Sequence, residues 1–227
     1  MSDIVSEPIR RRICGLAGVA LAAFVLTLVV DHVVHHVSHR YARALENQKG
    51  RRDLAKHILR NSVSLTSHLG AMSRTDCPVD PTILGRQIHS SLREMRSGLE
   101  VLIHGGTFVE VPPMGTEALD VPRDRISYRP EQPTGNDDEL VRLYQDVERA
   151  ENAARTLALR PAGSSEATAA RTQIMPTLTR ACDVMSQILG TTHRRMTALG
   201  VERSATLDRV RLIQLISTLA VATGTLV

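Results

Sequence analysis

The feature that most constrains this chain is a run of 18 residues without a charge near its N-terminus, Ile13–Val30. As a helix, such a run approaches the ~20 residues that cross a hydrocarbon core about 30 Å thick. The basic triplet Arg10–Arg12 precedes it and favours a cytoplasmic N-terminus. A cleaved signal peptide has the same order, but its apolar core is shorter, and the following DHVVHH has no small-x-small cleavage site. We therefore predict a transmembrane helix over residues 13–31, after a cytoplasmic segment 1–12.

A second apolar run closes the sequence. Leu212–Val227 contains 16 residues, and Gln214 is the only strongly polar one. Because the run stops at the last residue without a polar flank, we interpret residues 211–227 as a second transmembrane helix that is cut short, and we expect the natural chain to continue. A tail anchor or an amphipathic end is the alternative interpretation.

The central residues, 32–210, are expected to be exported, because the first membrane helix is predicted to enter with its N-terminus inside. In a bacterium this places the central domain in the periplasm and the chain in the inner membrane. Aromatic residues make up 2% of the sequence, which disfavours a β-sandwich core and favours helices packed through aliphatic residues. The net charge of +4 is spread along the chain without stacking aromatics or a nucleic-acid motif, so we do not expect nucleic-acid binding.

An apolar seam predicts that the first membrane helix continues outward to about Arg74. Residues spaced alternately three and four apart repeat without a break over more than five heptads, which is the pattern of a coiled-coil seam. The seam comprises Val34, Val37, Tyr41, Ala44, Gln48, Arg51, Ala55, Ile58, Ser62, Leu65, Leu69 and Met72.

The second predicted helix has clear start and stop signals. Asp80 is expected to be its N-cap and Pro81 its first helical residue, and Gly105 and Gly106 stop it. Residues 107–135 then carry five prolines and predict an ordered loop, with short strands at Phe108–Val111 and Ile126–Tyr128. A loop of this length is either functional or an insertion.

The third and fourth helices complete the pattern. Asn136 and Glu139 have capping-box spacing at the start of the third. The fourth runs from about Glu166 into the second apolar run, and Pro176 marks a kink or a late start. The apolar stripes of the second, third and fourth helices are Leu84, Ile88, Leu92, Met95, Leu99 and Leu102; Leu140, Leu143, Val147, Ala150, Ala154 and Leu157; and Ile174, Leu178, Ala181, Met185, Ile188 and Leu199.

Two long and two short helices fit an all-α fold, an antiparallel four-helix bundle that stands on two transmembrane helices. Such a chain can pass small axial shifts across a membrane. In this layout Cys77 lies near the membrane-distal tip and Cys182 roughly 25 Å lower. Bridged cysteines have Cα atoms within ~7 Å, so we expect no disulfide between them.

Polar residues on the seam are the candidate ligand-binding site. An unpaired charge in a coiled-coil core costs several kcal/mol. Arg51 therefore either extends outward or meets a Glu of the fourth helix, or else Arg51 or Arg52 faces its symmetry mate in a dimer. In the last case a small anion would bridge two guanidiniums, and Gly50 would allow close backbone approach.

Two short motifs resemble one family of sensor domains. The segment Asn47-Gln48-Lys49-Gly50-Arg51-Arg52 after the first membrane helix resembles an Asn-x-x-Gly segment of the N-terminal sensor domain shared by nitrate/nitrite sensor kinases and pilus-type chemotaxis transducers. Leu102-Ile103-His104-Gly105-Gly106, followed by Pro112-Pro113, resembles the Leu-x-x-Gly-Gly turn and proline loop of that domain. The resemblance implies a dimeric periplasmic four-helix bundle that feeds a histidine kinase or a methyl-accepting module.

The sequence also departs from the family pattern. The nitrate sensors carry an arginine three residues after the glycine, where this chain has Asp53. Arg51 and Arg52, with Asn47 and Gln48, are accordingly our candidate ligand-binding residues for a small anion, and nitrate itself is not predicted.

Four histidines lie next to the first membrane run. His32 with His36, and His35 with His39, are four residues apart, and each pair can chelate a divalent ion from one helix face. Solvated histidines without a ligand are the alternative, and we assign no metal and no cofactor. No CxxCH, nucleophile-elbow, phosphate-loop or HExxH motif occurs, so the sequence supplies no catalytic residue.

These observations predict the extracytoplasmic sensing and transmembrane signalling region of a bacterial signal transducer, a homodimer that takes a small anionic ligand. A membrane-anchored helical scaffold without a ligand and a histidine-based metal sensor are the alternatives.

Overall fold

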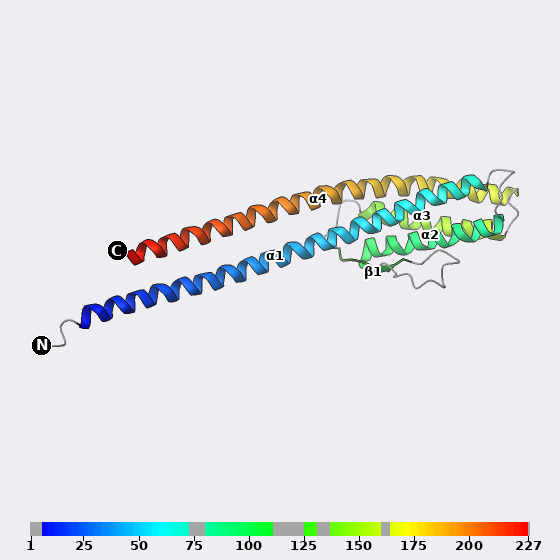
Figure 1. Ribbon diagram of the computed structural model, residues 1–227. Helices are drawn as coiled ribbons and strands as arrows, with labels where there is room; N and C mark the ends of the chain where they lie inside the picture. Colours follow the sequence, from blue (N-terminus) through cyan, green and yellow to red (C-terminus); the bar gives the residue numbers. More distant parts are fainter. Residues whose placement is uncertain (1–5, 73–79, 111–124, 131–136, 160–163, 227) are drawn as a thin grey trace. The chain divides into compact units, whose positions relative to one another are not determined.

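The computed structural model describes residues 6–72, 80–110, 125–130, 137–159 and 164–226. They form four helices and two short strands, in the order α1 (Ser6–Ala71), α2 (Pro81–His104), β1 (Gly106–Val109), β2 (Arg125–Tyr128), α3 (Asp137–Leu159) and α4 (Ser165–Leu226) (Figure 1). The predicted all-α class is confirmed.

The chain divides into two compact units. Unit 1 comprises Met1–Leu45 and Met196–Val227, and unit 2 comprises Glu46–Arg195. Helices α1 and α4 each contribute to both units, because neither is interrupted at the boundary.

The core of unit 2 draws on all four helices and on the strands. The apolar stripes predicted for α2 and α3 are buried throughout, as are the predicted inner-face residues of α4 within unit 2. The seam of α1 is buried from Gln48 to Met72. Before Leu45 the seam positions are only half-buried, so the predicted continuous burial of the seam is confirmed in unit 2 alone.

Polar contacts join α2 to α3, α3 to α4, and α4 to the end of α1. Arg96 of α2 lies 3.2 Å from the buried Glu151 of α3, and Arg180 of α4 forms an ion pair with Asp146 of α3. At the end of α1, Nη1 of Arg171 of α4 donates to the carbonyl oxygen of Met72. The last carbonyls of a helix have no partner within the helix, so this contact satisfies one of them.

The start of α2 follows the prediction closely. The carboxylate of Asp80 accepts a hydrogen bond of 2.8 Å from the backbone N–H of Thr82, and Pro81 is the first helical residue. The helix stops at Gly105, where φ is +79°, a conformation that side chains with a Cβ rarely adopt.

The ends of the other helices are confirmed in part. Helix α4 has begun at Ser165, and Pro176 lies inside it, so the prediction of a late start there is wrong. The predicted caps of α3 at Asn136, and Cys77 with its predicted lack of a disulfide, lie outside the described residues.

Strands β1 and β2 form an antiparallel ribbon in which Phe108 faces Ile126. Phe108 and Tyr128 are buried against the helices. The ribbon confirms the predicted strand pairing, although β1 begins at Gly106, two residues earlier than predicted.

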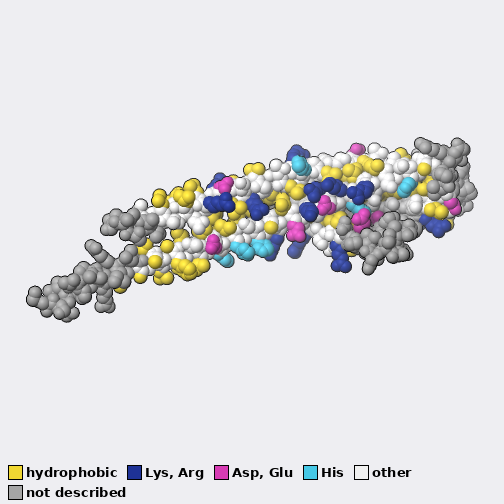
Figure 2. Space-filling view, in the orientation of Figure 1, with side chains coloured by type: hydrophobic (Ala, Val, Ile, Leu, Met, Phe, Trp, Pro, Cys, Tyr) yellow, Lys and Arg dark blue, Asp and Glu magenta, His cyan; other side chains and the backbone are white. Residues whose placement is uncertain are grey.

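Unit 1 exposes most of its large apolar residues, although Val30 and Leu199 are buried. On α1, Leu21 is 65% and Phe24 is 62% exposed. The described end of α4 has the same character at Leu212, Ile213, Leu215, Ile216 and Leu219. Figure 2 shows hydrophobic side chains over both terminal segments. The hydroxyls of Tyr41 and Thr206 lie 3.4 Å apart and link α1 to α4 within this unit.

One helix is long and apolar enough to cross a membrane among the residues that the structure describes. It is α1, where an 18-residue window has a mean hydropathy of 2.2 and is almost wholly exposed. The helix is therefore compatible with a membrane anchor near the N-terminus.

Candidate functional site

The Asn47 motif, defined here as Asn47–Arg52 of α1, contacts the segment that follows β2. The side-chain amide of Asn47 donates to the carbonyl oxygen of Arg129 (2.6 Å), and its oxygen accepts from the N–H of Arg129 (2.8 Å). Both ends of the carboxamide are thus used on one backbone residue, which fixes the segment after β2 against α1.

Two glycines of the motifs make room for the same segment. A Cβ on Gly50 would collide with the carbonyl oxygen of Ser127, and a Cβ on Gly105 would come within 2.6 Å of Cδ of Pro130. The Asn-x-x-Gly and Leu-x-x-Gly-Gly segments, which are distant in the sequence, therefore both contact residues 127–130. Their glycines have a packing role that the sequence alone did not reveal.

The other candidate ligand-binding residues lie on the same two turns of α1. Gln48 and Arg51 are each 7% exposed, so the predicted outward extension of Arg51 is wrong. Arg52 is half-buried, and its Nε lies 3.2 Å from the carboxylate of Asp53. An anion at Arg52 would have to compete with this carboxylate, whereas the burial of Arg51 lowers the local dielectric and strengthens its field.

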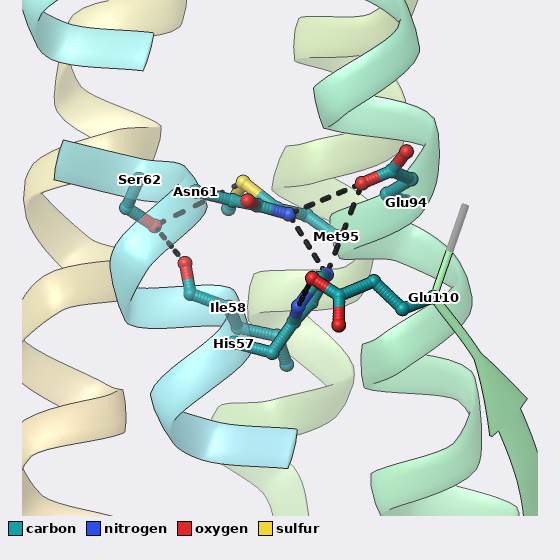
Figure 3. Close-up of polar contacts among 7 residues, drawn as sticks. All are labelled: His57, Ile58, Asn61, Ser62, Glu94, Met95 and Glu110. Carbon is teal, nitrogen blue, oxygen red and sulfur yellow. Dashed lines mark hydrogen bonds and ion pairs between the residues drawn. The ribbon is translucent and has the colours of Figure 1, made fainter. Parts of the chain in front are cut away.

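A second polar group, absent from the sequence-based predictions, lies one to three turns further along α1. The His57 cluster consists of His57 and Asn61 of α1, Glu94 of α2 and Glu110, which follows β1 (Figure 3). His57 is 7% exposed, and its ring centroid lies 4.8 Å from that of the buried Phe108. The cluster thus joins α1, α2 and the ribbon at one point.

The contacts of the cluster match one tautomer of His57. Nδ2 of Asn61 lies 3.0 Å from Nε2 of His57 and donates its second hydrogen to Glu94 at 3.5 Å. Because an amide nitrogen is a donor only, this orientation of the carboxamide matches the tautomer in which Nε2 accepts and Nδ1 carries the proton. Nδ1 faces a carboxylate oxygen of Glu110 at 3.5 Å.

Burial is the largest cause of the pKa shifts in this cluster. Desolvation lowers the pKa of His57 below its ordinary value; Arg60 acts in the same direction, and Glu110 acts against both. Desolvation also raises the pKa of Glu94, assisted by Glu110 and opposed by the hydrogen bond from Asn61. Both residues are therefore pushed toward their neutral forms.

The histidines of α1 in unit 1 include one pair whose rings are in contact. The four residues His32, His35, His36 and His39 are exposed, and the rings of His35 and His39 lie edge to face with centroids 5.2 Å apart. Among the described residues, no group of three or more His, Cys, Asp or Glu is arranged to hold a metal ion.

Comparison of the chain with protein-family models, with curated proteins and with solved structures found no match.

Proposed function

We propose that the chain is the extracytoplasmic sensing and transmembrane signalling region of a bacterial signal transducer. Unit 2 would be an antiparallel four-helix bundle in the periplasm, and residues 13–31 and 211–227 would anchor it in the inner membrane. The observation that carries the proposal is the continuity of α1, which has exposed apolar residues such as Leu21 in unit 1 and core residues such as Ile58 in unit 2.

An unbroken helix is a suitable connection between an input and an output. Its backbone hydrogen bonds make it stiff along its axis, so that a shift of 1–2 Å at one end, of the size seen when interface helices switch, is felt at the other. Helix α4 provides a second connection of the same kind. The output module, a histidine kinase or a chemotaxis-type domain, would follow the second membrane helix.

The proposed ligand is a small anion beside Arg51 and Arg52 in each protomer of a homodimer. Arg51 supplies a buried cation on α1, and its planar guanidinium suits a trigonal or tetrahedral oxyanion. Arg52 and Gln48 would contribute from the neighbouring turns. Asn47 would act by holding the ribbon next to the site, since its side chain is engaged by Arg129.

Titration calorimetry of the full chain in lipid nanodiscs with nitrate, nitrite, sulfate and phosphate tests this site. We expect one of these ions to bind, and we expect Arg51→Ala to weaken binding at least tenfold and Arg52→Ala to weaken it less. Arg60→Ala, an exposed position on the same helix, is the matched control. Absence of binding, or equal affinities in all three variants, would remove the anion site and leave the membrane-anchored scaffold.

A metal-responsive function is the second candidate, because His35 and His39 are already paired. Metal analysis of the untagged protein distinguishes the two candidates: bound Zn²⁺, Ni²⁺ or Cu²⁺ that is lost in His35→Ala favours the metal sensor.

A further inference from the structure

Charge is distributed unevenly over the outer surface of unit 2. The exposed residues of α3 are mostly charged, whereas none of those between Asn61 and Ala71 of α1 is. On α4, Glu166 is the only charged residue among the exposed ones from Ser165 to Thr179. Depletion of charge, rather than bulk hydrophobicity, distinguishes the centre of a protein–protein interface from the rest of a surface. The last turns of α1 and the first turns of α4 have this composition.

These turns of the two helices lie side by side. The hydroxyl of Ser62 is within hydrogen-bonding reach of the Cys182 thiol, and Arg171 reaches the carbonyl oxygen of Met72, so α1 and α4 are antiparallel neighbours here. Thr66 lies one turn beyond Ser62, and residues close to whole turns apart share a side of a helix. The α1/α4 face is defined here by its exposed residues Lys56, Thr66 and Gly70 of α1 and Thr168, Thr172, Met175, Thr179 and Asp183 of α4.

The threonines of the α1/α4 face have already satisfied their hydroxyl donors. The hydroxyls of Thr66, Thr168, Thr172 and Thr179 each donate to the carbonyl oxygen four residues earlier in the same helix, at 2.9–3.2 Å. Removing a donor from water is costly when it finds no new partner. Because no hydroxyl donor of this face would be orphaned, the threonines can be covered at little cost and can pack through their methyl groups.

Lys56 and Asp183 carry opposite charges at the end of the face nearest unit 1. Neither forms an ion pair with another residue that the structure describes. Lys56 lies six residues from Ser62, and Asp183 lies one residue from Cys182 in the same direction along the bundle. The two charges are therefore offset by about 7.5 Å along the helix axis, which a lysine side chain can span. The face thus has a positive charge on α1 and a negative charge on α4 at a similar level.

We propose that the α1/α4 face is the interface of the homodimer, with α1 of each copy packed on α4 of the other. The proposal deepens the proposed function and rests on its membrane anchors, because two copies anchored in one bilayer lie parallel at the same height. A two-fold axis along the helices then sets each α1 against the α4 of the other copy. Lys56 meets Asp183 of the partner subunit once on each side of the axis. A face that complements itself in this way fits a second copy of the chain.

Charge reversal in the full chain tests the proposal. Energy transfer between labelled copies in liposomes, followed as lipid is added, measures the dissociation constant of the dimer. We expect Lys56→Glu and Asp183→Lys each to raise it at least about tenfold, because like charges then meet at both contacts. The double variant should restore the dimer, since its charges are again complementary. Arg93→Glu on α2 and Asp138→Lys on α3 alter exposed charges elsewhere and are the matched controls.

Disulfide crosslinking tests the pairing of the helices directly. With the three native cysteines replaced by serine, Thr66→Cys is placed in one chain and Thr179→Cys in a second chain with a different tag. Counted from Ser62 and Cys182, the two positions are level to within one residue. Oxidation in the liposomes should give a covalent dimer that carries both tags, in higher yield than either variant alone.

Three results would overturn the proposal: a chain that is monomeric in liposomes, a dimer that the double variant fails to restore, or a dimer without this crosslink. A monomeric chain would leave the face to a different protein. Calorimetry of anion binding is read separately, so loss of the anion site leaves the dimer interface standing, and a monomer that still binds an anion removes the interface alone.

Discussion

The two parts of α1 place their apolar residues differently. Between Ile13 and Val30 the uncharged run leaves every face of the helix mainly apolar, and Leu21 and Phe24 are more than half exposed. In unit 2 the apolar residues form one stripe, and Leu54, Ile58 and Leu65 are completely buried. A stripe is typical of a helix packed on a protein core, whereas an exposed helix that is apolar all round is compatible with a membrane anchor. The change occurs within one unbroken helix.

The largest expected effect is on membrane association. An arginine at the centre of a membrane helix costs about 2.5–3.5 kcal/mol on the insertion scale. The double variant Leu21→Arg and Phe24→Arg should therefore move the chain from the membrane to the soluble or aggregated fraction after cell fractionation. The same charges at exposed apolar positions of unit 2, in Val63→Arg and Ile83→Arg, should leave it in the membrane. An unchanged distribution of the first variant would show that the two parts of α1 do not differ in solvent.

Core truncation should give the next largest effect. Leu65→Ala removes a completely buried side chain of α1 and should lower the free energy of unfolding of unit 2 by about 2–5 kcal/mol. Val63→Ala, two residues away and exposed, should change it by less than about 0.5 kcal/mol. Chemical denaturation followed by circular dichroism measures both. Equal losses would contradict the assignment of a single buried face.

Gly50 and Gly190 both lie inside helices. Comparing them separates the effect of side-chain packing on stability from that of helix propensity. Gly50→Ala should displace the ribbon and destabilise unit 2 by about 1–3 kcal/mol, because the new methyl group would overlap the carbonyl of Ser127. A Cβ on Gly190 meets no atom within 4 Å, so Gly190→Ala should stabilise α4 by up to about 1 kcal/mol. Thermal unfolding would reveal shifts of opposite sign. A stabilising Gly50→Ala would mean that the ribbon is not seated on α1.

The smallest expected effect is a change in the pH dependence of stability. The raised pKa of Glu94 favours unit 2 below about pH 4.5, and this contribution is lost as the pH rises through the raised value. Glu94→Gln should therefore gain stability relative to the unsubstituted chain between pH 5 and 8, measured by urea midpoints. The control variant Glu100→Gln, at an exposed position of the same helix, should not gain stability in this range. A loss of stability in Glu94→Gln that grows with pH would reverse the assigned sign.

Local signals predicted most of the helical framework. Asp80 and Gly105 cap α2 at the positions predicted from the sequence, because capping depends on neighbouring backbone groups. For the candidate anion site, the sequence predicted which residues of α1 to consider, but not their burial or their contacts. The pairing of Asn47 with Arg129 joins residues 82 positions apart, and no periodic pattern encodes such a contact. His57 was missed for the same reason, since its partners come from α2 and from the end of β1.

By itself, the sequence determined the all-α class, the apolar stripes and the helix stops, because each depends on residues within a few turns of one another. The tertiary structure decided which polar residues are buried and which residues they contact. It placed Gly50 beneath Ser127, buried Arg51, and enclosed His57 between two glutamates from separate elements. The physical reason is that burial and electrostatic environment are properties of contacts between distant segments, which only the folded chain brings together.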